Sequence, residues 1–304
     1  MGSRYLQGLA ASEEDLDIWV FDVSVESLKR AEIRWREVKA RTAHRVSFVS
    51  SISDLPQTLQ LVIVATTADV RAELVERIAN ISKVRYWILE KVLGQNKEDL
   101  NRIKRVTANR SQAWVNTPTL QWELYKKLRS KYPQEQSINV NIENFSGLAC
   151  NAIHFIDFVC RWSGAKLLEV DTQGLNSKWR QSKRAGFYEI DGHLGMRFND
   201  GSSLKLASQQ DNIPAIVNLD INGQKWTVDE AKGMASTSDG QIVVGKTELQ
   251  SQLTAPTVKA ILYELPCGLP TLAQSIEQHE VFLDALMSHW NTHMPEKMDR
   301  LPIT

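Results

Sequence analysis

Short apolar runs alternate with helical patterns through the first part of the chain. Strands are expected at 17–22, 46–49, 61–66 and 84–89, with helices at 25–39, 69–80 and 97–108. The runs at 61–66 and 84–89 show no polar alternation, which is typical of strands covered on both faces. Strands that alternate with helices in this way predict parallel βαβ units. Residues 1–114 are therefore expected to form a doubly wound, Rossmann-type α/β domain.

The pattern changes after residue 114. Helices are expected at 118–132, 147–162 and 271–290, and turn sequences at 190–192, 198–201 and 219–223 separate short alternating segments. Asn-Gly and Asp-Gly turns between such segments are typical of hairpins. Residues 115–304 are therefore expected to form an α+β domain with a mainly antiparallel sheet.

Apolar residues recur at alternate positions of these segments, as in Leu204 and Leu206 and in Val217, Leu219 and Ile221. A sheet that has one face on its own helices needs cover for an apolar outer face. We therefore expect the sheet to pack against another subunit, which predicts a homo-oligomer, either a dimer or a tetramer.

The start of the chain lacks one expected element. A Rossmann domain opens with a strand, a glycine turn and a helix, but here Gly2 has no strand in front of it. Asp22 follows Gly2 by 20 residues and ends the next apolar strand. That spacing suits an acid that binds the adenosine ribose, although an acid at a strand end is also commonly a solvated turn residue. We expect a Rossmann-type sheet truncated at its first strand.

Two basic residues are placed where chemistry is expected. Lys91 follows the apolar strand at 84–89, whose polar residues appear only at its carboxyl end, the end that faces the ligand in doubly wound sheets. His154 lies in the helix expected at 147–162 and shares a face with Asp157. A lysine and a histidine near a cofactor can carry proton transfer during alcohol oxidation. The alternatives are a solvated lysine and a core histidine.

A cationic run at 178–184 places Arg180 and Arg184 just before the central sheet. Arginine binds phosphate or carboxylate in bidentate fashion, so these two residues are candidate substrate contacts. The alternative is a solvated loop.

Composition narrows the functional class. Lys and Arg together number 36, as do Asp and Glu, so no global charge points to nucleic acid or to an anionic membrane surface. The 42% hydrophobic and 24% charged residues are typical of a soluble globular protein. Three widely spaced cysteines predict neither a disulfide framework nor a metal site, and favour the cytoplasm.

Taken in order, Gly2 and Asp22, the strand ending in Thr66-Thr67, the pair Glu90-Lys91 and the segment from Ile153 to Asp157 resemble the glucose–fructose oxidoreductase/inositol dehydrogenase family. The resemblance covers nearly the whole chain. It implies a first domain that binds NAD or NADP, and a second that supplies the substrate pocket and an oligomerising sheet. The cofactor contacts are then expected at Gly2, Ser3, Arg4, Asp22, Thr66, Thr67, Glu90 and Lys91. The substrate contacts are expected at Lys91, Asn151, His154, Asp157, Arg180 and Arg184.

Four positions depart from the family pattern. Val92 replaces the proline after the Glu-Lys pair, Cys150 replaces an aspartate four residues before His154, Arg71 replaces a histidine, and Tyr5 replaces the third glycine of the fingerprint. Without a carboxylate at position 150 the usual proton relay is incomplete, because a thiol orients a histidine poorly.

The resemblance implies an NAD(P)-dependent oxidoreductase that transfers hydride to or from a hydroxyl-bearing carbon of a sugar, cyclitol or nucleotide sugar. Lys91 and His154 are the expected catalytic residues. NAD is expected rather than NADP, because Asp22 repels a 2′-phosphate. The alternative is a non-catalytic or regulatory member that binds nucleotide or sugar without turnover.

Overall fold

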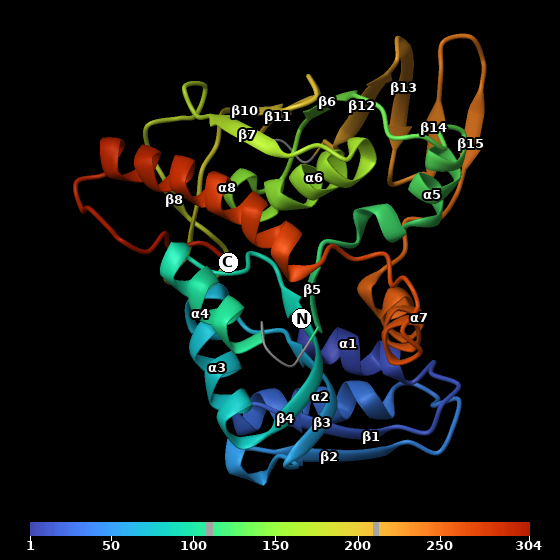
Figure 1. Cartoon of the computed structure of the whole chain (residues 1–304), viewed down its shortest axis with the longest axis vertical. Helices are drawn as coiled ribbons and strands as arrows, with labels where there is room; N and C mark the ends of the chain where they lie inside the picture. Colours follow the sequence, from blue (N-terminus) through green and yellow to red (C-terminus); the bar gives the residue numbers. More distant parts are fainter. Residues whose placement is uncertain (108–111, 209–212) are drawn as a thin grey trace.

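A computed structural model describes residues 1–107, 112–208 and 213–304 (Figure 1). Its first half alternates helices and strands as expected. The order is α1 (Gly2–Leu9), β1 (Asp17–Phe21), α2 (Val25–Arg36), β2 (Arg45–Val49), the 3₁₀ turn η1 (Ile52–Asp54), β3 (Thr58–Val64), α3 (Ala68–Ile81), β4 (Lys83–Glu90), α4 (Lys97–Thr107) and β5 (Gln112–Asn116). The expected end of α4 at residue 108 lies outside the described residues. β5 runs two residues past the boundary expected at 114.

The strands of this half form two separate parallel sheets. β1 pairs with β2, and β3, β4 and β5 pair in that order. In the doubly wound order 3-2-1-4-5-6 the first strand lies between the second and the fourth, which correspond to β1 and β3 here. Among the described strands, neither β1 nor β3 has a second partner. The Rossmann-type fold truncated at its first strand is therefore confirmed.

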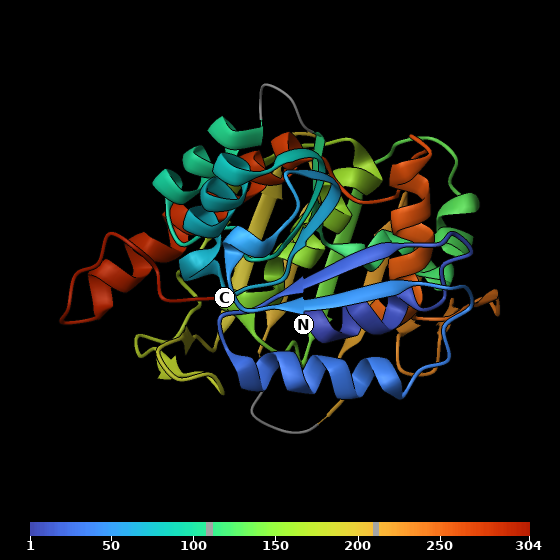
Figure 2. The ribbon, with the colours of Figure 1, turned by 90° about the horizontal axis from the view of Figure 1, so that it is seen from below.

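Side chains along the two unpaired edges are only half-buried, in contrast to β4. Residues 18–21 of β1 and 61–63 of β3 are partly exposed, whereas Trp87, Ile88 and Leu89 of β4 are at most 2% exposed. Figure 2 shows the β1–β2 pair beside the three-stranded sheet. A sheet with helices on both faces normally buries such apolar strands. The partial exposure of β1 and β3 therefore agrees with the lack of a strand between them among the described strands.

Helix α1 occupies the start of the chain, where no strand forms. A Cβ built on Gly2 would lie 3.7 Å from the Cβ of Ala65, just beyond β3, so α1 begins at the carboxyl end of that strand. Tyr5, at the position of the third fingerprint glycine, is buried and donates a hydrogen bond of 2.5 Å to Glu90 Oε1. α1 also packs on α7 (Gln250–Leu262), a helix from the second half of the chain.

The second half is built on an eight-stranded sheet in the order β15-β14-β13-β12-β6-β11-β10-β7. Only the pairing of β11 with β6 is parallel, which confirms the mainly antiparallel sheet. The strands are β6 (Ile138–Glu143), β7 (Leu167–Asp171), β10 (His193–Phe198), β11 (Ser203–Ala207), β12 (Ile216–Ile221), β13 (Gln224–Asp229), β14 (Met234–Ser236) and β15 (Ile242–Val244).

Two of the three expected hairpins are present. The turns at 198–201 and 219–223 join β10 to β11 and β12 to β13. The expectation at 190–192 is wrong, because that turn leads from β9 (Tyr188–Glu189) to β10, and β9 pairs instead with β8 (Arg180–Gln181) in a separate two-stranded sheet. The turn chemistry marks a reversal of the chain but not the partner of the preceding strand.

The helices of the second half lie between its sheet and the first domain (Figure 1). They are α5 (Glu123–Ser130), α6 (Leu148–Ser163) and α8 (Leu272–His293). The single helix expected at 118–132 is instead the 3₁₀ turn η2 (Pro118–Gln121) followed by α5, because Trp122 between them is extended, with φ −63° and ψ 137°. α7 was not expected, and Pro256 in its interior obscures its pattern.

The apolar alternation of the sheet faces inward. Leu204, Leu206, Val217, Leu219 and Ile221 are each at most 1% exposed and belong to the main core, against which α6 packs. The other face carries polar residues, including Asn139, Asn141, Lys205 and Asp220. The reason given for an oligomer is therefore wrong, because the chain covers its own apolar face. The oligomeric state itself stays a prediction.

Candidate functional site

The end of β4 meets the start of α6. Lys91 directly follows β4, and its Nζ donates hydrogen bonds to Asn151 Oδ1 at 2.8 Å and to the Cys150 carbonyl at 3.0 Å. The two halves of the chain thus meet at residues that the sequence singled out. We call Lys91, Cys150, Asn151, His154 and Glu189 the domain junction.

Burial governs the two basic groups of the junction. Burial lowers the pKa of Lys91. The charges of Cys150, Glu90 and Glu189 oppose this lowering, and the charge of Arg71 adds to it. Burial also lowers the pKa of His154 to about 3, with further contributions from the charges of Lys91 and His279. At neutral pH the His154 imidazole is therefore uncharged and lies beside an amine whose proton is held less tightly than usual.

Cys150 stays a thiol. Burial, followed by the charge and hydrogen bond of Glu189, raises its pKa to about 12. Sequence reasoning missed Glu189, which lies at the end of the two-residue strand β9 and is 5% exposed. Its Oε1 accepts the backbone N–H of Ala149 at 2.5 Å and its Oε2 that of Cys150 at 3.3 Å. The carboxylate absent from position 150 is thus matched by one from another element.

Two expected cofactor contacts lie where β3 meets α3. Thr67 is the N-terminal boundary residue of α3, and the Thr66 hydroxyl is buried without a hydrogen-bond partner in the described part of the chain. The Arg71 side chain is fully buried and donates to the carbonyls of Thr66 and Val92 and, at 3.1 Å, to that of Leu93. Arg71 therefore ties the β3–α3 connection to the segment after β4.

The remaining expected cofactor contacts are spread over three elements. Gly2, Ser3 and Arg4 form the first turn of α1, where the Ser3 hydroxyl accepts a hydrogen bond from Arg34 and Arg4 contacts Gln7. Asp22 follows β1, and its Oδ1 accepts the Ser24 N–H at 2.8 Å. Glu90 is buried and accepts hydrogen bonds from Tyr5 and, at 2.8 Å, from Asn116. Each lies at or just beyond the carboxyl end of a strand, or at the start of α1.

The expected substrate contacts divide into two groups. Asn151 and His154 belong to the junction, whereas Asp157 is fully buried and accepts hydrogen bonds from Thr117, Arg161 and Gln278 at 2.8, 2.9 and 3.3 Å. Burial raises the pKa of Asp157. Its carboxylate is thus fully used in holding α6 to its surroundings.

The two arginines of the cationic run differ. Arg180 forms a bidentate ion pair with Asp191, with N–O distances of 2.6 and 3.1 Å. Arg184 is exposed and has no acidic partner in the described part of the chain. Burial lowers the pKa of the Met1 terminal amine; the charge of Glu90 opposes this shift and that of Arg184 reinforces it.

The last residues of the chain contact the start of α3 and the segment after β4. Ala68 at the start of α3 donates its N–H to Thr304 Oγ1 at 2.9 Å, and the Gln95 side-chain amide donates to the Ile303 carbonyl at 3.1 Å. Leu301 and Ile303 are fully buried. No sequence motif marked this segment, because its contacts depend on the return of the chain after α8.

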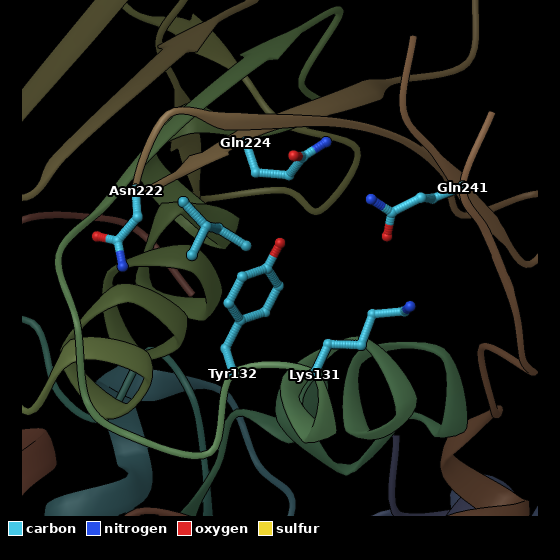
Figure 3. A pocket seen from close by; sticks show the side chains of 6 residues that line it. Lys131, Tyr132, Asn222, Gln224 and Gln241 are labelled. Carbon is cyan, nitrogen blue, oxygen red and sulfur yellow. The ribbon is translucent and has the colours of Figure 1, made fainter. Parts of the chain in front are cut away.

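Two cavities lie elsewhere. One of about 470 Å³ is lined by Lys131, Tyr132, Gln224 and Gln241, whose side chains face it in Figure 3. A larger one of about 1080 Å³ lies between the ends of α5 and α6 and helix α8. Neither includes a residue predicted for the site. In the described ranges no group of His, Cys, Asp and Glu side chains could hold a metal ion, and no helix is long and apolar enough to cross a membrane.

No protein-family model matches the chain, and no curated protein matches it by sequence. Solved structures do match it in fold. UDP-N-acetylglucosamine 3-dehydrogenase from Acidithiobacillus ferrooxidans has a TM-score of 0.69 at 14% identity, with 94% of this chain and 92% of that chain covered. Biliverdin reductase from Synechocystis, in complex with biliverdin and NADP⁺, has a TM-score of 0.69 at 12% identity, with 94% of each chain covered.

Levoglucosan dehydrogenase, in complex with NADH and levoglucosan, has a TM-score of 0.67 at 13% identity, with 97% of each chain covered. Such low identities establish the fold and leave the chemistry to the residues at the junction. The chain has the two-part fold of the oxidoreductases typified by glucose–fructose oxidoreductase and inositol dehydrogenase.

Proposed function

We propose that the protein is an NAD(P)-dependent oxidoreductase that acts on a hydroxyl group of a sugar, cyclitol or nucleotide sugar. The observation that carries this proposal is the contact between Lys91, at the carboxyl end of β4, and Asn151 at the start of the helix that bears His154. Two structures with the same fold are those of sugar-type dehydrogenases, which supports the substrate class.

The chemistry divides between the two basic groups. Nicotinamide, when bound, accepts or returns the hydride. Lys91, with its lowered pKa, is the better group to take up the hydroxyl proton, because an amine whose pKa lies closer to neutrality exchanges protons more readily. His154 is uncharged at neutral pH and orients the hydroxyl through a hydrogen bond. Asn151 keeps the Lys91 amine in place.

The described residues fit a dinucleotide in part. The Thr66 hydroxyl is buried and unpartnered at the end of β3, and Asp22 uses one carboxylate oxygen on Ser24 and has the other available for a ribose hydroxyl. The start of α1 offers backbone N–H groups to an anion, as Rossmann helices do. The glycine turn that would cradle the pyrophosphate is not formed by the described residues. Asp22 favours NAD, and NADP stays possible.

A second candidate is a protein that binds nucleotide or sugar without turnover. The unpaired edges of β1 and β3, together with Tyr5 in place of a glycine, favour it. Titration of NAD with the protein, followed by a turnover screen on polyols and nucleotide sugars, separates the two. Binding without turnover would favour this second candidate.

The direct test is mutation of Lys91. In an active enzyme Lys91→Ala lowers kcat by about 100-fold or more, the range for loss of one acid–base group, and leaves NAD affinity nearly unchanged. His154→Ala has a similar effect. The double variant lowers kcat by less than the product of the two single losses, because the effects of residues that act as a unit are not additive. Full activity of Lys91→Ala would refute the mechanism.

A further inference from the structure

Helix α6 begins without a side-chain cap of its own. Gly147, with φ 82°, precedes it, and the carboxylate of Glu189 accepts the N–H groups of both Ala149 and Cys150. A Cβ on Gly147 would approach Glu189 Oε2 to 3.2 Å, so glycine allows this close approach. An anion at a helix N-terminus both satisfies free N–H groups and complements the helix dipole.

The same first turn holds Lys91. The Lys91 amine donates to the Cys150 carbonyl and to the Asn151 side chain, so both of its acceptors belong to the turn that Glu189 fixes. The charges of Glu90 and Glu189 both raise the pKa of the Lys91 amine against the effect of burial, and that of Glu90 contributes more. The Cys150 thiol, whose pKa is raised to about 12, opposes the lowering of the Lys91 pKa only when it is ionised, so at neutral pH the opposing charges are those of Glu90 and Glu189.

We propose that Glu189 is the positioning residue of the junction: its carboxylate fixes the first turn of α6, which holds Lys91, and adds at that turn a negative charge that position 150 lacks. Its effect on catalysis rests on the proposed function. Its effect on the Lys91 amine does not, and this difference allows the two to be tested separately.

The test compares Glu189→Gln with Glu189→Asp and with Glu143→Gln in the whole chain. Glu189→Gln keeps an acceptor oxygen for the Ala149 N–H but removes the charge. Glu143 is an exposed glutamate at the end of β6 in the same half of the chain, so Glu143→Gln is a matched control. The readout is the pH dependence of Lys91 acetylation by acetic anhydride, followed by peptide mass spectrometry.

We expect Glu189→Gln to lower the Lys91 pKa, because the opposing charge of Glu189 is lost while that of Glu90 remains. At a fixed pH below that pKa, Lys91 acetylation would be faster than in the unchanged chain, by about tenfold for each unit by which the pKa falls. Glu189→Asp should retain most of the original titration, and Glu143→Gln all of it. If Glu189→Gln lowers the melting temperature but leaves the Lys91 titration unchanged, Glu189 is only a structural cap and the inference is refuted.

The kinetic arm applies if turnover is found. Glu189→Gln should shift the pH profile of kcat/KM toward lower pH, in the same direction as the Lys91 titration, and change kcat more than it changes KM for the substrate. A shifted Lys91 titration in a protein without turnover supports the positioning role while refuting the proposed function. An unshifted titration in an active enzyme refutes the positioning role alone.

Discussion

The unpaired edges of β1 and β3 predict that one added strand stabilises the protein. The perturbation is an N-terminal extension of about ten residues that encodes a five-residue apolar strand and a Gly-x-Gly turn leading into α1. β1 has five residues and β3 has seven, so a five-residue strand has neighbours along its whole length. The same extension places backbone N–H groups where the pyrophosphate would lie.

The magnitude follows from hydrogen bonds, burial and entropy. A central five-residue strand forms up to about ten backbone hydrogen bonds, each with a net value of about 1 kcal/mol. Five buried apolar side chains contribute about 10 kcal/mol, at about 2 kcal/mol each. Ordering about ten residues costs about 15 kcal/mol. The balance is about 5 kcal/mol, which corresponds to a rise in melting temperature of roughly 10 °C.

The assay is thermal unfolding and NAD titration of the chain with and without the extension. The control carries an extension of equal length in which two strand positions are proline, since proline cannot donate to the ladder. The chain without the extension should bind NAD poorly, and the strand-forming extension should raise both stability and affinity. An unchanged melting temperature, or micromolar NAD binding without the extension, would show that the present arrangement of β1, β3 and α1 is already complete.

Four further predictions follow from single features. With the strand restored, Asp22→Ala should weaken NAD binding and relax discrimination against NADP, which a paired titration measures; equal affinities before mutation would remove this role of Asp22. Cys150→Asp should lower the free energy of unfolding by about 2 kcal/mol in denaturant titration, because it would place a second carboxylate beside Glu189. Adding Glu189→Gln to that variant should reduce this destabilisation. The pKa of His154 falls on folding from 6.5 to about 3, so between these values the unfolded chain binds more protons than the folded chain. The free energy of unfolding therefore falls as pH falls through that window. His154→Gln should lessen this fall by up to about 1.4 kcal/mol per pH unit. Light scattering at tens of micromolar tests the expected homo-oligomer, and a monomer would contradict it.

The sequence was sufficient for what depends on local periodicity. The strand at 84–89 and the helix at 147–162 follow from runs of apolar residues, and a residue just past a parallel strand must lie at the carboxyl edge of the sheet. That logic placed Lys91 and His154 on the elements that do meet. The sequence also predicted that β1 and β3 lie in separate sheets, because a missing first strand leaves each of these two strands without the partner that would join them.

The sequence was insufficient where a contact depends on how distant segments return. Glu189 lies on a two-residue strand with no periodicity, and its partners are 39 and 40 positions away in the chain. Thr304 reaches α3 only because the chain turns back after α8. Asp157 shares a helix with His154, but at three residues along it enters a different environment, enclosed by Thr117, Arg161 and Gln278. Spacing on a helix predicts a shared side but not what packs against each turn.

The substitution of Cys150 for an aspartate shows why a motif should be judged by the charge it delivers. A nearby negative charge raises the pKa of a buried amine such as that of Lys91, whichever segment supplies it. A carboxylate within α6 would carry that charge on the helix itself. Glu90, next to Lys91 in the chain, and Glu189, at the end of β9, both deliver such a charge, and Glu189 also satisfies N–H groups of the first turn. A buried carboxylate at position 150 would then be redundant and, beside Glu189, unfavourable, so the cysteine is the residue that this arrangement accommodates.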